Sequence, residues 1–410
     1  MEQEVLPKHQ PTGGRPPTNP LVSLIRDSSG LERVIYALLV FIPLAFIAEF
    51  AHFDSTLVFF FSCLGITPLA KIMGTATEEL AVKTGSGIGG LLNATFGNAV
   101  ELIIAIFALL EAQREPQLLE VVKASITGSL VGNLLFVLGL AILVGGWKRE
   151  KQTFNATATR SSNTLLTLTA IALIMPAVFA FTLSTPTTAA QQTDQTNLLE
   201  ALSIGVAIIL ILSYAAQLLF SLRTHAFLFG GSSGEMEEAD ESHGWSARAS
   251  ILVLVGATVL VGFMAEFLVG SVEALTKGFG WTELFVGAIL IAIIGNAAEH
   301  LTAVIVAMKN KMDLAIGIAV GSSTQVAAFV APVLVLVGFL LGGGSRLNLI
   351  FSPFELVAII LSIFIVNVVA NDGESNWLEG VQLLAAYLII AIAFYLHPPL
   401  APAVPLPSAK

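Results

Sequence analysis

Charged residues are scarce in this sequence. Lys, Arg, Asp and Glu make up 12% of its 410 residues, about half of the roughly 25% that is usual in soluble domains. Hydrophobic residues make up 55%, and the net charge is −10. This composition excludes an ordinary soluble domain and indicates a polytopic membrane protein, for which no nucleic-acid partner is expected.

Cysteine is nearly absent as well. Cys63 is the only one, so neither a disulfide framework nor a cysteine-rich metal site is possible. No cleavable signal peptide is expected, because the first apolar run follows a long polar, proline-rich stretch rather than a short basic start. We predict that residues 1–30 are a disordered cytoplasmic tail and that residues 397–410 form a second tail.

The sequence contains many long apolar runs. Each is close to the length of about 20 residues that a helix needs to cross a hydrocarbon core of about 30 Å. The eleven runs are residues 32–51, 56–80, 88–112, 121–145, 163–182, 198–222, 247–275, 282–308, 313–341, 353–370 and 376–396. The predicted fold class is therefore an all-α integral membrane protein with about eleven transmembrane helices.

Basic residues predict how the chain is oriented in the membrane, because Lys and Arg are enriched in cytoplasmic loops. If the N-terminus is cytoplasmic, the cytoplasmic connections hold Lys83, the basic segment 148–151, Arg160 and Lys309. The opposite connections hold far fewer basic residues. The sequence thus predicts a cytoplasmic N-terminus.

Two similar motifs place a glutamate inside an apolar run. They are Gly-Asn-Ala-Val-Glu at residues 97–101 and Gly-Asn-Ala-Ala-Glu at residues 295–299. A charged side chain at the centre of a bilayer costs at least about 2.5–3.5 kcal/mol on insertion scales. One such glutamate is often an interhelical hydrogen-bond partner, but its recurrence in both halves of the chain favours a duplicated site.

The repeat extends beyond the two glutamates. Ser129 follows the first motif, and Ser322 and Gln325 follow the second. In the predicted topology the run 88–112 crosses from inside to outside, whereas the run 282–308 crosses from outside to inside. Five runs in each unit then make two inverted repeats, an architecture of many secondary transporters, with the site at the interface between the repeats.

The domain boundaries follow from this arrangement. Residues 31–55 are an extra first helix, residues 56–225 the first repeat and residues 247–396 the inverted second repeat. The connector 226–246 is rich in Gly, Ser, Asp and Glu. It is either a solvated cytoplasmic linker or a cation-attracting or regulatory segment.

The motifs offer oxygen ligands for a hard cation. In each motif Asn and Glu are three residues apart, so Asn98 and Glu101, like Asn296 and Glu299, share one helix face. The preceding glycine permits a kink that exposes backbone carbonyls. Two carboxylates with amide and hydroxyl oxygens, those of Ser129, Ser322 and Gln325 included, match what Ca²⁺ binds, so we predict that these residues bind the ion.

The same carboxylates are able to carry protons. Two glutamates that face each other at low dielectric resist simultaneous ionisation, so a proton is held when no cation is bound. His300 is predicted to belong to the ion-binding site as a further titratable group, or it is a packing residue. Ser125 and Asn133 are site neighbours or ordinary helix-packing residues, and Glu78, Glu79 and Glu266 are candidates for gating or accessory roles near the ends of their runs.

The sequence resembles the calcium/cation–proton exchanger (CAX) family of the cation/Ca²⁺ exchanger superfamily. The two motifs and their continuations, Leu102 and His300, look like that family's paired signatures, and the resemblance covers about residues 35–395. Further matching stretches are residues 77–81, 89–96, 306–309, 311–315, 321–323 and 372–380. The resemblance implies eleven spans, an acidic loop after the sixth, and Glu101 and Glu299 as the carboxylates that bind the ion.

The resemblance also implies a function. We expect an antiporter, not an enzyme, that exports cytosolic Ca²⁺ in exchange for H⁺ by alternating access, with Ca²⁺ and H⁺ as transported ions and no cofactor. The alternatives are Na⁺/Ca²⁺ or Mn²⁺/H⁺ exchange and, from another class, a cation channel. The membrane is vacuolar in a fungal or plant cell and the cell membrane in a bacterium, and the oligomeric state is open between monomer and homotrimer.

Overall fold

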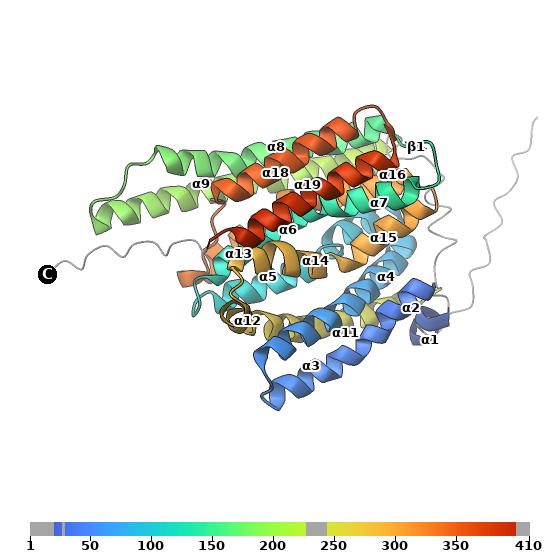
Figure 1. Ribbon diagram of the computed structural model, residues 1–410, viewed down its shortest axis with the longest axis horizontal. Helices are drawn as coiled ribbons and strands as arrows, with labels where there is room; N and C mark the ends of the chain where they lie inside the picture. Colours follow the sequence, from blue (N-terminus) through green and yellow to red (C-terminus); the bar gives the residue numbers. More distant parts are fainter. Residues whose placement is uncertain (1–19, 27–28, 227–243, 399–410) are drawn as a thin grey trace, which may run out of the picture.

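The structure, a computed structural model, describes residues 20–26, 29–226 and 244–398, and these are almost entirely helical (Figure 1). Most of the predicted connector 226–246 and most of the two predicted tails lie outside these residues. The α-helices are α1 (Pro20–Arg26), α2 (Gly30–Ala37), α3 (Phe41–Phe50), α4 (Ser55–Phe96), α5 (Ala99–Glu111), α6 (Leu118–Val131), α7 (Leu138–Gly146), α8 (Ala156–Thr182), α9 (Ala189–Leu219), α11 (Ala247–Gly270), α12 (Val272–Phe279), α13 (Glu283–Phe285), α14 (Ala292–Gly295), α15 (Ala297–Met308), α16 (Met312–Gln325), α17 (Ala331–Leu341), α18 (Pro353–Val369) and α19 (Trp377–Leu396).

Shorter elements join several of these helices. The 3₁₀ turns are η1 (Leu38–Val40) and η7 (Gly343–Ser345), the π-helical segments are η2 (Gly132–Val137), η3 (Phe220–Thr224), η5 (Val286–Ile291) and η6 (Val326–Val330), and the strands are β1 (Gln152–Thr153) and β2 (Glu374–Ser375). Segments η2 and η6 each continue a helix that carries one of the predicted site serines. Because single π turns widen a helix at the cost of regular hydrogen bonding, they are frequent at functional sites.

The described helices are long and apolar enough for a multi-pass membrane protein. Eight stretches in these ranges qualify as membrane spans, and a ninth is added when the bent pair Glu283–Gly295 and Ala297–Met308 is taken as one. Two predicted spans fall outside that set: α18 has 17 residues, and the run 88–112 is interrupted between α4 and α5. The predicted all-α membrane fold is confirmed.

The outer surface of the bundle is apolar. Large side chains such as Leu212, Leu252, Leu340 and Ile389 are between 60% and 82% exposed. In water such a surface would be an aggregation site, whereas lipid tails solvate it. The exposed side chains therefore support the same conclusion as the helix lengths.

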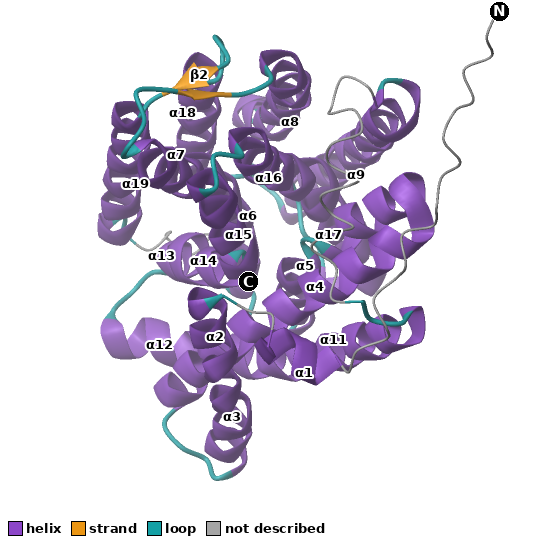
Figure 2. Ribbon diagram, turned by 90° about the vertical axis from the view of Figure 1, so that its right-hand side faces the viewer, coloured by secondary structure: helices purple, strands orange, loops and turns teal. Residues whose placement is uncertain are grey.

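The broken helices lie in the middle of the bundle. Helices α3, α11 and α12 form one side, α8, α18 and α19 form the opposite side, and α5, α14 and α15 run between them (Figure 1, Figure 2). Helix α4 packs on α3 and α11. Residues on α5 and α15 are consequently shielded from lipid by helices on both sides.

Local sequence signals set where several of these helices begin. Ser29, Ser352 and Asn376 each form a capping box with a glutamate three residues later, which satisfies backbone N–H groups that have no partner within the helix. Asp54 caps α4 by accepting a hydrogen bond from the Thr56 N–H. These caps mark the starts of α2, α4, α18 and α19.

A small antiparallel pair joins two distant connections at one end of the bundle. In it, Gln152 of β1 lies opposite Ser375 of β2 (Figure 2). Lys151 Nζ and Glu374 Oε1 are 2.6 Å apart, and the Asn155 N–H donates to Asp313 Oδ1 over 2.5 Å. The segment before α8 is thereby tied to the segment before α19 and to the start of α16.

Part of the predicted N-terminal tail is helical rather than disordered. Residues 20–26 form α1, where Ser23 and Leu24 are buried. Ser23 Oγ accepts a hydrogen bond of 2.7 Å from the Trp245 indole N–H. The tertiary contact with Trp245, which the local proline-rich composition does not reveal, explains why this segment departs from the prediction.

Candidate ion-binding site

Each repeated motif lies at a break between two helices. Asn98, with φ −100° and ψ 21°, separates α4 from α5, and Asn296, with φ −97° and ψ 4°, separates α14 from α15. The second break bends the helix axis by 59°. Glu101 and Glu299 therefore lie in the first turns of α5 and α15, where the positive end of the helix dipole stabilises a carboxylate. Each motif thus has a helix break of the kind that the preceding glycine permits.

The two motifs meet, and each glycine lies against the glutamate of the other motif. A methyl group added at Gly97 would lie 3.3 Å from Glu299 Oε1, and one added at Gly295 would lie 2.8 Å from Glu101 Cγ. A side chain at Gly295 would collide with Glu101, and one at Gly97 would collide with the Asn93 carbonyl oxygen, at 2.8 Å, as well as crowding Glu299. The glycines thus bring the predicted residues of both halves into one region.

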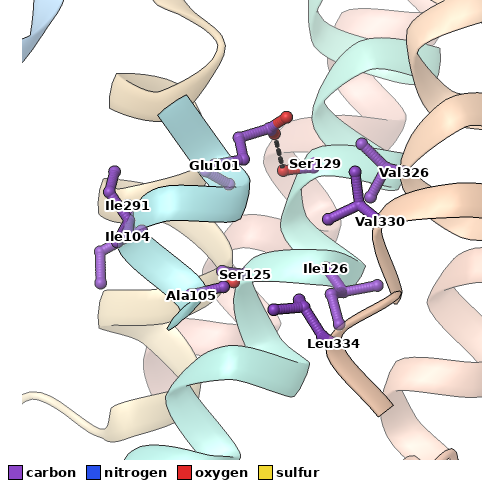
Figure 3. A pocket seen from close by; sticks show the side chains of 11 residues that line it. Glu101, Ile104, Ala105, Ser125, Ile126, Ser129, Ile291, Val326, Val330 and Leu334 are labelled. Carbon is purple, nitrogen blue, oxygen red and sulfur yellow. Dashed lines mark hydrogen bonds between the residues drawn. The ribbon is translucent and has the colours of Figure 1, made fainter. Parts of the chain in front are cut away.

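Glu101 is held by hydrogen bonds from the other elements. Ser129 Oγ on α6 donates to Glu101 Oε1 over 2.6 Å, as Figure 3 shows. Asn296 Nδ2 donates to the same carboxylate oxygen and to the Ala292 carbonyl, the latter over 2.9 Å. Beyond Glu101 lies a cavity of only about 10 Å³, which is room for about one water molecule.

Apolar side chains make up most of the wall of that small cavity. Ile104, Ile126, Val330 and Leu334 lie around it together with Ser125 (Figure 3). They come from α5, α6, η6 and α17. Glu101 is thus closed off by apolar packing on this side.

Glu299 faces a much larger space. It lines a cavity of about 760 Å³ that reaches Asn155, Asn310 and Asp313, all exposed residues in or beside the connections near the β1–β2 end. Glu299 Oε2 is buried and has no hydrogen-bond partner. A buried carboxylate oxygen without a donor is costly, so this oxygen is available to a cation or a proton.

Further polar residues of the cavity wall come from both halves of the chain. Lys71 and Glu78 on α4 contribute, and Ser322 and Gln325 on α16 lie near the Glu299 end. Lys71 Nζ is 3.4 Å from Glu32 Oε1 of α2. The Glu32 carboxylate therefore compensates the positive charge of Lys71 in the wall of the large cavity.

An amide network connects the two motifs. Asn98 Nδ2 donates to Gln325 Oε1 over 2.5 Å, and Ser322 Oγ donates to Asn98 Oδ1 over 3.2 Å. Asn133 Nδ2 donates to Ser322 Oγ over 3.1 Å and lies 3.4 Å from Asn296 Oδ1. All the predicted oxygen ligands from both motifs thus belong to one cluster.

The accessory residues predicted from the sequence have three different environments. Glu78 lines the large cavity. Glu79 is buried and accepts a hydrogen bond of 3.0 Å from the Trp245 backbone N–H, so it anchors the start of α11. Glu266 is exposed on α11 and lines neither cavity, which gives its predicted gating role no structural support.

Asn133 is the site neighbour that the sequence prediction undervalued. It is 1% exposed and contacts Asn296 of the second motif and Ser322. Its spacing of four residues from Ser129 was the available signal, because residues i and i+4 share a helix face. That spacing alone equally fits an ordinary packing residue.

The donor set suits a hard cation. Within the described ranges no group of three or more His, Cys, Asp and Glu side chains gathers around a common point. The oxygen donors at hand are the carboxylates of Glu101 and Glu299 with neighbouring hydroxyl and amide oxygens. Ca²⁺ accepts such a mixture of charged and neutral oxygens.

We expect the two cavities to differ in access from water, and cysteine labelling tests this. Thr302→Cys lines the large cavity and Ile104→Cys the small one, while native Cys63 is buried. A membrane-impermeant thiol reagent should label the Thr302→Cys variant at least about tenfold faster, because thiol reactivity requires access. Equal labelling rates would contradict the closure of the bundle around Glu101.

Comparison with known families covers nearly the whole chain. The family model described as sodium/calcium exchanger protein matches residues 54–223 and again residues 249–396. The same model therefore matches each half, in agreement with the internal repeat of the motifs.

Relatives of known activity are similar over most of their length. The chain is 45% identical to the Ca²⁺/H⁺ antiporter of Synechocystis sp. over 385 residues, covering 90% of this chain and 99% of that protein. It is 39% identical to the vacuolar calcium ion transporter of Schizosaccharomyces pombe, covering 88% and 84%. The solved structure of native YfkE is 42% identical and superposes with a TM-score of 0.74, covering 88% of this chain and 100% of that one.

Proposed function

The chain belongs to the Ca²⁺/H⁺ antiporter (CAX) family within the cation/Ca²⁺ exchanger superfamily, and from this premise we propose that it exports cytosolic Ca²⁺ in exchange for H⁺ at the site formed by Glu101 and Glu299. It is a multi-pass membrane transporter. One of its relatives is named as a vacuolar transporter. The proposal requires a membrane across which a pH gradient exists and does not specify which membrane of the cell this is.

The observation that carries the proposal is the unequal access of the two facing glutamates. Glu299 borders a cavity of about 760 Å³, whereas Glu101 borders one of about 10 Å³. A site that reaches one side of the membrane and is closed toward the other is what alternating access requires. A channel would need a continuous path past both carboxylates.

Competition for the carboxylates provides the coupling. Both glutamates are enclosed by helices, and in such low dielectric two neighbouring carboxylates are not ionised together without a compensating cation. Ca²⁺ supplies two positive charges and favours release of the protons. Once Ca²⁺ leaves on the other side, protonation restores neutrality, so each ion displaces the other.

The orientation of the cycle rests on the predicted topology. With a cytoplasmic N-terminus, the connections around Asn155 and Asn310 are cytoplasmic, so the large cavity faces the cytosol. Ca²⁺ enters there and reaches Glu299 before Glu101. Movement of α4 and α11, which pack on each other, then opens the site to the opposite side.

Transport by purified protein in proteoliposomes tests the proposal. An imposed pH gradient should drive Ca²⁺ uptake at an initial rate at least about tenfold above that without a gradient, since a tenfold proton gradient supplies about 1.4 kcal/mol per exchanged proton. A Na⁺ gradient of the same size should drive no uptake. Uptake that follows Na⁺ and ignores pH would instead assign Na⁺/Ca²⁺ exchange.

A matched control guards against non-specific leakage of Ca²⁺. Glu49→Gln removes a glutamate from α3 that lines neither cavity. This variant should retain the wild-type response to the pH gradient. Uptake that persists after the membrane potential and pH gradient are both collapsed would point to a channel.

A further inference from the structure

Asn133 occupies the junction between the two motifs. It lies in η2 and donates through Nδ2 to Ser322 Oγ and toward Asn296 Oδ1, while its Oδ1 lies 3.0 Å from His300 Nε2. No other residue of the network contacts Asn296, Ser322 and His300 together among the contacts of the described chain.

A backbone carbonyl determines the direction of each hydrogen bond between Ala292 and His300. The Ala292 carbonyl only accepts, so it must face the amino group of Asn296 rather than its carbonyl oxygen. Asn296 Oδ1 then faces Asn133, which must present its own amino group. Asn133 Oδ1 is left for His300, whose Nε2 must therefore carry the hydrogen.

The hydrogen bonds that lead from Asn133 toward the first motif take their direction from the same Asn133 amide. Because Asn133 Nδ2 donates to Ser322 Oγ, the Ser322 hydroxyl is able to donate onward to Asn98 Oδ1. Asn98 Nδ2 then points to Gln325 Oε1. Asn133 thus links the oriented amides of the two motifs, through Asn296 on one side and Ser322 on the other.

His300 lies behind this network rather than in the ion path. It lines neither cavity. Its ring packs edge-on against Phe136, with 6.0 Å between ring centroids, and Phe136 in turn packs on Tyr387 at 5.1 Å. The ring is held by aromatic packing, and its contact toward the site is through Asn133.

We propose that Asn133 is a positioning residue for ion exchange, and that His300 acts by donating its Nε2–H to Asn133 and not by binding the transported ion. Asn133 in turn links Asn296, which donates to Glu101, to Ser322, which donates to Asn98. This inference rests on the proposed function, since its principal readout is the KM for Ca²⁺.

Three substitutions measured in proteoliposomes test the role of the donated hydrogen. Asn133→Leu and His300→Leu should each raise the KM for Ca²⁺ at least about tenfold, because buried amide groups lose their partners. His300→Gln should stay within about threefold of the wild type, since the glutamine amide supplies an N–H near the position of Nε2. Inactivity of the His300→Gln variant would overturn the proposal, because it would require a titrating imidazole.

The double variant separates positioning from two unrelated effects. If His300 acts through Asn133, adding His300→Leu to Asn133→Leu should change the KM by less than about twofold, as residues in one network are not additive. Multiplicative effects of the two substitutions would contradict the proposal. Asn163→Leu, which removes a buried asparagine of α8 that takes no part in this network, is the control and should leave the KM unchanged.

A spectroscopic measurement keeps this inference distinct from the proposed function. Nitrogen-15 NMR of labelled histidine, assigned by the signal lost in the His300→Gln variant, should show the neutral tautomer with hydrogen on Nε2. Absence of proton-driven Ca²⁺ uptake by the wild type would remove the proposed function and leave this result standing. A hydrogen on Nδ1 alone would overturn the network even where uptake is normal.

Discussion

Glu101→Gln and Glu299→Gln are each expected to reduce Ca²⁺ uptake driven by a pH gradient at least about 100-fold, which corresponds to about 2.7 kcal/mol. Glutamine keeps the shape of glutamate but removes both the negative charge that binds Ca²⁺ and the group that holds a proton. Initial uptake rates in proteoliposomes measure the effect. Glu49→Gln is the control for loss of a glutamate from a membrane helix.

Both variants should still fold and insert. At residue 101 the glutamine carbonyl oxygen is able to accept the hydrogen bonds that Ser129 and Asn296 donate to Glu101 Oε1. At residue 299 the buried Oε2 has no hydrogen-bond partner, so no protein contact is lost there. Gel filtration in detergent checks the fold, and a variant that folds and retains normal proton coupling would contradict the two-carboxylate site.

Gly128→Ala is expected to have the next largest effect, a loss of at least about 90% of transport together with reduced yield of folded protein. A methyl group at Gly128 would overlap the backbone carbonyl of Ala288 in η5. Gly287 approaches the same interface from the other side, where an added methyl group would lie 2.6 Å from the Val121 carbonyl oxygen. Overpacking at such an interface typically costs about 1–3 kcal/mol, and here it would push α6 away from the helix that carries the second motif.

The matched control for this prediction comes from the second repeat. Gly321 occupies the position in α16 that corresponds to Gly128 in α6, yet a methyl group there would meet nothing within 4 Å. Gly321→Ala should therefore retain transport and folding. Thermal unfolding in detergent and uptake assays compare the two variants, and equal damage by both would contradict the close contact of α6 with η5.

The contrast between these glycines shows where the two repeats diverge. Both halves carry Gly-Ser at corresponding positions, and both continue into a π-helical segment. In the first half the glycine permits helices to touch through their backbones. In the second half the same Gly-Ser dipeptide places Ser322 beside the large cavity. The repeated residues therefore make different contacts in the two halves.

The sequence by itself determined the fold class, the approximate limits of most spans and the pairing of the two motifs. Each of these is a local property, because span length follows from the thickness of the membrane and a buried charge is costly wherever it lies in an apolar run. The kinks at Asn98 and Asn296 were likewise predictable, since glycine next to asparagine weakens a helix at that point. Family resemblance added the transported ions.

Only the tertiary structure decided which polar residues reach the site. Glu78 and Glu79 are adjacent in the sequence, yet one lines the cavity and the other anchors Trp245. Asn133 joins the network, whereas Glu266 is exposed on a distant face. Helical periodicity assigns a residue to a face, but the neighbour of that face depends on contacts between segments about 160 to 230 residues apart. Those contacts also decide that Glu299 faces the large cavity while Glu101 faces the small one.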